Sequence, residues 1–109
     1  MGLFNNGRKI QQTDRDQIQN NARFADSLSK YAGIDSKTAN TIGNLADKIR
    51  YFAPSTLQKV LDIDRKIENK LADLKIELAA NYPDMKKVEL CIKDVTNLLA
   101  DRDYESKKK

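Results

Sequence analysis

The chain has 109 residues and a formal net charge of +4, with 39% hydrophobic and 33% charged residues. This length suits one domain with a modest core, and the scarcity of proline and glycine favours helices over an all-β fold. The absence of histidine and the single cysteine, Cys91, argue against acid–base catalysis at neutral pH, a zinc site and an internal disulfide. Because there is no run of about 18 apolar residues and no signal-peptide pattern, we expect a soluble, cytoplasmic protein.

The positive charge is concentrated at the two ends of the chain. Arg8 and Lys9 contribute two positive charges, and the three lysines at 107–109 contribute three. Subtracting these five from +4 leaves residues 10–106 with a net charge of −1. A protein that binds a nucleic-acid duplex gathers Lys and Arg on one folded face. We therefore do not favour nucleic acid as a partner.

The first twelve residues are rich in glycine and asparagine and develop no helical period. This pattern predicts a flexible N-terminal arm over residues 1–12. An alternative role for the arm is a shallow contact with a membrane surface. The side chains that would make this contact are those of Leu3, Phe4, Arg8 and Lys9.

A first helix is predicted over residues 14–32. Thr13 is its expected N-cap, and Asp14 and Asp16 lie in the first turn, where the helix dipole favours negative charge. The apolar face of this helix is rich in alanine, which predicts close packing against a neighbour. Gly33 is the residue expected to end it.

A second helix is predicted over residues 36–53, with Asp35 or Ser36 as its N-cap. Gly43 lies inside this helix, where glycine costs about 1 kcal/mol relative to alanine. We interpret Gly43 as a small residue that allows another helix to approach closely. The pattern ends just before Pro54, which cannot donate a backbone hydrogen bond.

The joint at Pro54 has two interpretations. Ser55 and Gln58 have the spacing of a capping box, which would start a new helix. On that ground we favour a real turn between the second and third helices. The alternative is a single long helix that kinks at Pro54.

The third helix, predicted over residues 55–81, carries the clearest pattern in the chain. Spacings of three and four place one apolar set on a single face: Val60, Ile63, Ile67, Leu71, Leu74 and Leu78. The set repeats at intervals of eleven, which indicates a nearly straight stripe. A second and weaker stripe consists of Leu61, Ala72, Ile76 and Ala79. Two apolar sides predict a central helix that contacts more than one neighbour.

A fourth helix is predicted over residues 84–103. Its apolar residues follow a strict heptad spacing: Met85, Val88, Ile92, Val95 and Leu99. In an antiparallel hairpin they would face the third helix in one register: Leu78 with Val88, Leu74 with Ile92, Leu71 with Val95, and Ile67 with Leu99. We therefore predict an antiparallel helical hairpin at the C-terminal end. Residues 104–109 are expected to form a charged, flexible tail.

No grouping of residues in the sequence predicts a catalytic, metal or cofactor site. The carboxylates of the third helix alternate with lysine and arginine, which is typical of a solvated helix face; they are Asp62, Asp64, Glu68, Asp73 and Glu77. Cys91 flanks an apolar seam without a basic neighbour in the adjacent turn, which predicts a buried, unreactive thiol. We expect a protein that is not an enzyme and that uses no cofactor.

The predicted fold is all-α: a small four-helix bundle over residues 13–103 with a C-terminal antiparallel hairpin. Apolar residues outside the main seams indicate helix–helix contact with a protein partner or a second copy of the chain; the candidates are Leu57, Leu61, Ala72, Ile76 and Leu90. We expect a non-enzymatic interaction or adaptor protein, with a homodimer favoured and no small-molecule substrate. The alternatives are a small basic bundle of the immunity or stress type that docks on a membrane, and a weak nucleic-acid-binding protein.

Overall fold

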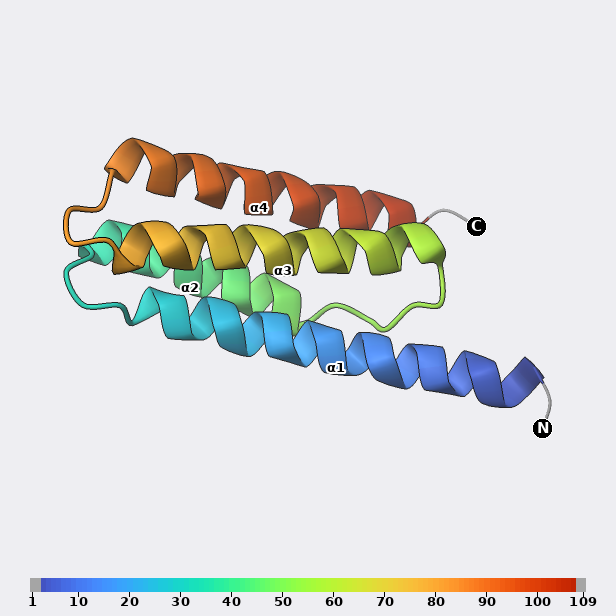
Figure 1. Ribbon diagram of the computed structural model, residues 1–109. Coiled ribbons are helices and arrows are strands. Elements are labelled where there is room, and N and C mark those ends of the chain that lie inside the picture. Colours follow the sequence, from blue (N-terminus) through green and yellow to red (C-terminus); the bar gives the residue numbers. More distant parts are fainter. Residues whose placement is uncertain (1–2, 108–109) are drawn as a thin grey trace.

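The computed structural model describes the backbone of residues 3–107 and the side chains of residues 13–107. Within that range the regular structure is helical (Figure 1). The four helices are α1 (Leu3–Ser29), α2 (Ser36–Arg50), α3 (Gln58–Ala79) and α4 (Met85–Lys107). The predicted all-α four-helix bundle is confirmed.

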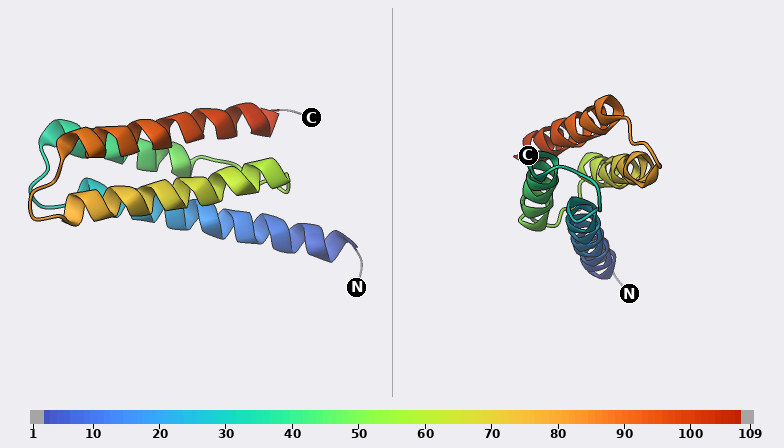
Figure 2. Two further views of the ribbon diagram at one scale, coloured as in Figure 1. Left: turned by 45° about the horizontal axis from the view of Figure 1, so that its top comes forward. Right: turned by 90° about the vertical axis from the view of Figure 1, so that its left-hand side faces the viewer.

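The helices are arranged as two antiparallel pairs, α1 with α2 and α3 with α4. The pairs meet because α1 also packs against α3, and α2 against α4. Figure 2, seen along the bundle, places α2 and α3 on a diagonal. The connection over residues 51–57 therefore crosses one end of the bundle.

The core lies between the four helices and is formed by their apolar stripes. All six residues of the predicted α3 stripe are buried, so that part of the prediction is confirmed. On α4, Val88, Val95 and Leu99 are buried, whereas Ile92 is half-buried and Met85 is 40% exposed. Burial of side chains of this size stabilises the fold by about 1.5–3 kcal/mol for each one.

The second stripe of α3 does not form a contact with another helix. Ala72, Ile76 and Ala79 are exposed and Leu61 is half-buried. α3 does contact a second neighbour, α1, but it does so along its main stripe. Asn21 Nδ2 on α1 donates to the backbone oxygen of Asp64 at 3.0 Å, and Ile18 of α1 belongs to the same core cluster as Ile67. The prediction of two neighbours was right, and the predicted second surface was wrong.

The N-terminal region differs from the prediction. α1 begins at Leu3, so residues 3–12 are helical and Thr13 lies inside the helix, where it is not an N-cap. A single glycine costs a helix only about 1 kcal/mol, and a helix anchored by its packed part extends readily into neighbouring residues such as Arg8 and Lys9. At the other end, α1 stops at Ser29, and Gly33 takes a positive φ of 90° in the turn that follows.

The start of α2 agrees with the prediction, but the interpretation of Gly43 was wrong. Asp35 is the N-cap, and its side chain accepts a hydrogen bond from the backbone N–H of Thr38. A Cβ atom built on Gly43 would lie 4.0 Å from Ser29 Cβ, which is ordinary van der Waals contact. The approach of α1 and α2 at this point therefore does not require a glycine.

A real turn separates α2 from α3, as favoured, but the predicted capping box does not form. α3 begins after Leu57, whose side chain makes no capping hydrogen bond. The hydroxyl of Ser55 instead accepts from the N–H of Leu57 at 3.1 Å, and Gln58 Nε2 donates to Asp62 at 2.8 Å. Because the chain must first cross the end of the bundle, the helix starts later than the local pattern predicted.

The C-terminal helix is longer than predicted. α4 continues to Lys107, so residues 104–107 belong to the helix and not to a tail. Residues 108–109 lie outside the described part of the chain. Arg102 lies just before this extension, and it is a charged residue whose side chain is buried.

Candidate functional site

The structure brings two of the predicted contact residues, Ile76 and Leu90, to one place. Ile76 on α3 is 68% exposed and Leu90 on α4 is 60% exposed. Both line an open hollow of about 310 Å³ between the two helices. The other residues lining it are Asp73, Glu77, Lys87 and Cys91. Two large apolar side chains that share one exposed hollow form an apolar patch.

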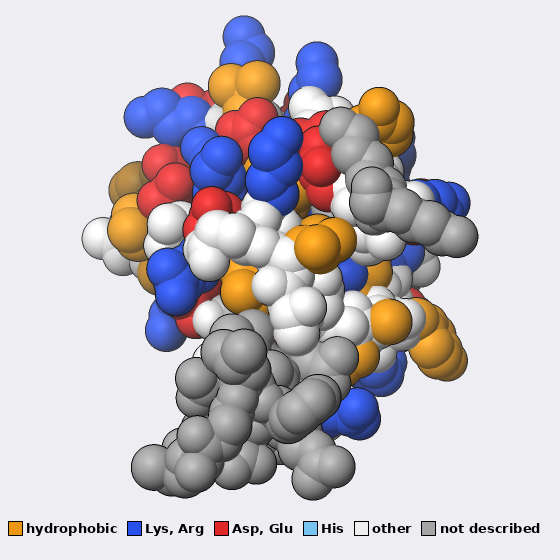
Figure 3. All heavy atoms as spheres, turned by 90° about the vertical axis from the view of Figure 1, so that its right-hand side faces the viewer, with side chains coloured by type: hydrophobic (Ala, Val, Ile, Leu, Met, Phe, Trp, Pro, Cys, Tyr) orange, Lys and Arg blue, Asp and Glu red, His pale blue; other side chains and the backbone are white. Residues whose placement is uncertain are grey.

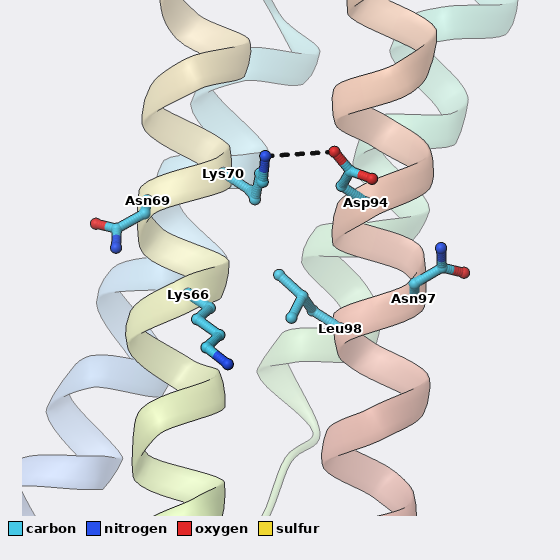
Figure 4. A pocket seen from close by; sticks show the side chains of 6 residues that line it. All are labelled: Lys66, Asn69, Lys70, Asp94, Asn97 and Leu98. Carbon is cyan, nitrogen blue, oxygen red and sulfur yellow. Dashed lines mark ion pairs between the residues drawn. The ribbon is translucent and has the colours of Figure 1, made fainter.

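A second hollow of about 430 Å³ lies further along the same two helices. Figure 4 shows Lys66 and Leu98 pointing into it from opposite helices, while Asn69 and Asn97 lie at its outer edges. Lys70 Nζ reaches across from α3 to a carboxylate oxygen of Asp94 at 3.4 Å. This ion pair bridges the two helices between the first hollow and the second.

The surface continues toward the end of the bundle. A third hollow shares Lys66 and Leu98 with the second and extends to Tyr104 and Glu105 on α4. We call this row of three hollows the hairpin face; it runs from Ile76 and Leu90 to Tyr104 along the outer side of α3 and α4.

The remaining predicted contact residues do not join Ile76 and Leu90. Leu57 is 45% exposed at the start of α3, more than two-thirds of the helix away from Ile76. Leu61 is half-buried, and Ala72 is exposed but lines none of the three hollows described above. The hairpin face thus retains two of the five predicted residues.

The predicted membrane-contact residues Leu3, Phe4, Arg8 and Lys9 lie within α1, but their side chains are outside the described part of the structure. No helix in the described part of the chain is long and apolar enough to span a bilayer.

Cys91 lies at the edge of the apolar patch and is half-buried. Burial raises the pKa of its thiol, and the negative charge of Asp73 adds to the effect. A thiol with a raised pKa stays protonated at neutral pH and is a poor nucleophile. The predicted unreactive thiol agrees with this environment, although the side chain is less buried than expected.

A buried cluster of charged side chains was not predicted from the sequence. Its centre is Arg102 on α4, which is 1% exposed. Arg102 Nε donates to Asp64 Oδ1 on α3 at 2.6 Å, and Nη2 lies 3.3 Å from Asp14 Oδ2 on α1. The exposed fraction of each aspartate is also 1%. The prediction that Asp64 belongs to a solvated helix face was therefore wrong.

The cluster also holds the 51–57 connection in place. Arg102 Nη2 donates to the backbone oxygen of Ala53 at 3.1 Å, and the backbone N–H of Ser55 donates to Asp14 Oδ2 at 2.6 Å. The guanidinium carbon of Arg102 lies 4.3 Å from the centre of the Phe52 ring, a cation–π contact. Three helices and a connection thus meet at one arginine.

Figure 3 looks onto the end of the bundle where this connection lies. Acidic and basic side chains are interspersed across the part formed by α3 and α4, and hydrophobic groups are scattered among them. The buried cluster lies beneath this mixed surface, where Asp14, Asp64 and Arg102 are shielded from water.

Two features set the carboxylates of the cluster apart from ordinary ion-pair partners. Asp14 Oδ1 is buried and has no hydrogen-bond partner. Burial raises the pKa of Asp64 to about 7, and a hydrogen bond with Asp14 adds to the rise, while Arg102 opposes it. One guanidinium is shared between two carboxylates and a carbonyl oxygen, so it does not offset the loss of solvation of both acids.

A sequence signal for this cluster exists. Arg102 follows Leu99 by three residues and so continues the heptad spacing of α4, and Asp64 lies between Val60 and Ile67 on the α3 stripe at spacings of four and three. The register that pairs Ile67 with Leu99 pairs Asp64 with Arg102 at the next position. Opposite charges at facing seam positions are the pattern that would have identified the pair.

The chemistry available in these residues is that of ion pairing and proton binding. Among residues 13–107 there is no group of three or more His, Cys, Asp or Glu side chains that could hold a metal ion. A comparison of the whole chain with protein-family models, curated proteins and solved structures finds no match.

Proposed function

We propose that this protein is a non-enzymatic interaction module that associates with a second copy of itself through the hairpin face. The observation that carries the proposal is the convergence of Ile76 and Leu90, both largely exposed, on one hollow. Apolar side chains of this size lose unfavourable contact with water when a second surface covers them, and each contributes about 1.5–3 kcal/mol on full burial.

The charges around the apolar patch favour a second copy as the occupant. The α3 side of the hollow carries Asp73 and Glu77, and the α4 side carries Lys87. A two-fold axis that passes over the patch parallel to the helices would place the acidic α3 side of one copy opposite the basic α4 side of the other. Such a pairing is self-complementary, and it steers two identical surfaces into one orientation.

The size of the hairpin face is sufficient for a dimer. α3 has 22 residues, which corresponds to a length of about 33 Å at 1.5 Å per residue. Two helices packed side by side are about 18–20 Å wide, so the face covers roughly 600 Å². A specific interface needs a total buried area of about 1,000 Å² or more, which is roughly 500 Å² for each partner.

The molar mass in solution, measured by light scattering over a range of protein concentrations, tests this proposal. The chain has a mass of 12.4 kDa, and we expect twice that value at the higher concentrations. Ile76→Lys and Leu90→Lys each place a charge in the apolar patch, and we expect both variants to be monomers. The control is Tyr51→Lys, which changes an exposed aromatic residue (85% exposed) at the opposite end of the bundle and should leave the dimer intact.

Two results would contradict the proposal. A wild-type chain that stays monomeric at the highest concentration excludes self-association. A dimer that persists in both Ile76→Lys and Leu90→Lys excludes the hairpin face as its interface. Circular dichroism of each variant verifies that a change in mass does not come from unfolding.

A further inference from the structure

The buried cluster leaves one hydrogen-bond acceptor that no donor reaches. The acceptors are the four carboxylate oxygens of Asp14 and Asp64 and the backbone oxygen of Ala53. The donors directed at them are Arg102 Nε, the two N–H groups of Arg102 Nη2, and the backbone N–H of Ser55. These N–H groups reach four of the five oxygens, and the oxygen left over is Asp14 Oδ1.

The charges of the cluster are also unbalanced. Two ionised carboxylates and one guanidinium leave one negative charge, in a place where each side chain is about 1% exposed. A buried unpaired charge is costly, and a carboxyl group avoids this cost by taking up a proton. One proton on Asp64 would both neutralise the cluster and supply the missing donor for Asp14 Oδ1.

We propose that Asp14 and Asp64 hold a single proton between them in the folded protein, and that loss of this proton loosens the attachment of α1 and the 51–57 connection to α3 and α4. The proton resides on Asp64 and is donated to Asp14 Oδ1. Arg102 then pairs with the one remaining negative charge, so the cluster is neutral. This inference does not depend on the proposed self-association.

The surroundings of the cluster contain few other groups that would alter its charge. α1 contributes Asp14, and the Asn21 side chain that bonds to the backbone of Asp64. On α3, Glu68 is the nearest acid in the hydrogen-bond chain, because Gln17 Nε2 donates both to Asn21 Oδ1 at 3.0 Å and to Glu68 at 3.2 Å. α4 contributes Arg102, and the buried residues of α2 are all apolar.

The sign of the pH dependence follows from linkage. The folded protein holds a proton on Asp64 up to a pKa of about 7, whereas its ordinary value is 3.8. Between these two values the folded state binds more protons than the unfolded state, so the contribution of Asp64 to stability decreases as the pH rises. The stabilising contribution of Asp64 is complete below pH 3.8 and is lost as the pH rises through about 7.

The variant Asp64→Asn tests the proposal, because an asparagine amide permanently supplies the donor and carries no charge. Thermal unfolding of the full-length chain is measured for wild type and variant between about pH 4 and pH 8. We expect the melting temperature of the variant to rise relative to that of wild type as the pH increases, with most of the change between about pH 4 and pH 7. A difference that stays constant, or that changes in the opposite direction, would show that Asp64 is ionised in the fold and would overturn the proposal.

The control for this comparison is Asp62→Asn. Asp62 lies on the same helix but is exposed, and it accepts one hydrogen bond from Gln58. We expect its melting temperature to follow that of wild type at each pH. At each pH, the melting temperature of wild type is subtracted from that of the variant. This difference removes the contributions of all other titrating groups.

A measurement on the wild-type chain keeps the proposal testable if Asp64→Asn does not fold. The ¹³C chemical shift of the Asp64 carboxyl carbon reports its protonation directly, and we expect a midpoint near 7. Above that midpoint we expect the Ser55 amide, which donates to Asp14, to lose protection from hydrogen exchange after correction for the intrinsic rate. A carboxyl midpoint below about 4, or Ser55 protection that stays unchanged through the titration, would overturn the proposal.

Discussion

Arg102 Nε donates a hydrogen bond to Asp64 Oδ1 across 2.6 Å, although the two residues are 38 positions apart in the sequence. They lie one seam position beyond Ile67 and Leu99, so the contact agrees with the register predicted for the hairpin of α3 and α4. The Lys70–Asp94 ion pair at 3.4 Å joins the same helices nearer to their turn. Two charged contacts, one buried and one exposed, thus align the hairpin along its length.

The buried arginine is expected to be essential for stability. Arg102→Met removes the only cation that contacts the carboxylates of Asp14 and Asp64 among the ion pairs of the described residues. Removal of one partner from a buried ion pair costs about 3–5 kcal/mol, and we expect a decrease of that size in the free energy of unfolding, measured in urea. The control is Arg65→Met, an exposed position on α3, which should change the value by less than about 0.5 kcal/mol. A loss below about 1 kcal/mol for Arg102→Met would contradict the central role of the cluster.

Asp14 is expected to control the titration of Asp64. Both the hydrogen bond and the charge of Asp14 raise the pKa of Asp64. Asp14→Asn removes the charge, so we expect the carboxyl ¹³C titration of Asp64 to move to lower pH. In the matched variant Asp62→Asn the midpoint should stay where it is in wild type. An unchanged midpoint in Asp14→Asn would mean that the two carboxyl groups do not interact.

Gly33 and Gly43 should respond to alanine in opposite directions. Gly43 lies inside α2 with space for a methyl group, and Gly43→Ala should stabilise the protein by about 0.5–1 kcal/mol, because alanine favours the helix. Gly33 has a φ of 90°, and an L-residue in the left-handed region costs about 1–2 kcal/mol. Gly33→Ala should therefore destabilise it. Urea unfolding of both variants tests the prediction. A change in the free energy of unfolding that has the same direction in both variants would contradict it.

The seam of the hairpin is expected to tolerate loss of side-chain volume poorly. Leu74 is fully buried between the helices, and Leu74→Ala should lower the free energy of unfolding by about 2–5 kcal/mol, because it removes buried methyl groups and leaves a cavity. Lys75 is the neighbouring exposed residue, and Lys75→Ala should have an effect within about 0.5 kcal/mol. Similar losses for both substitutions would mean that Leu74 is not in the core.

The candidate contact surface could be predicted only in part. Ile76 and Leu90 were identified because they lie outside the apolar seams of their own helices, and the hairpin then brings them to one hollow. Leu57 and Leu61 were chosen on the same ground, but the path of the 51–57 connection and the packing of α3 separate them from that hollow. The exposure of a residue depends on neighbours that helical periodicity does not identify.

The first and last residues of the helices could also be predicted only in part. Local signals limited the cap of α2 to Asp35 or Ser36, and Asp35 is the cap, since an N-cap depends on backbone groups three residues away. The start of α3 was misplaced because Ser55 is held by Asp14, a residue 41 positions earlier in the chain. A long-range hydrogen bond to the backbone prevailed there over a local capping pattern.

The amino-acid sequence by itself determined the four helices and the apolar seams of α3 and α4, and it favoured a turn at Pro54, because these features depend on periodicity and on residues close together in the chain. Only the tertiary structure decided that Asp14, Asp64 and Arg102 meet in a dry interior. Three charged residues on three helices look like solvated surface groups when each is considered alone. Their burial is possible only because folding places them within hydrogen-bond distance of one another, and charge pairing then offsets part of the cost of removing them from water.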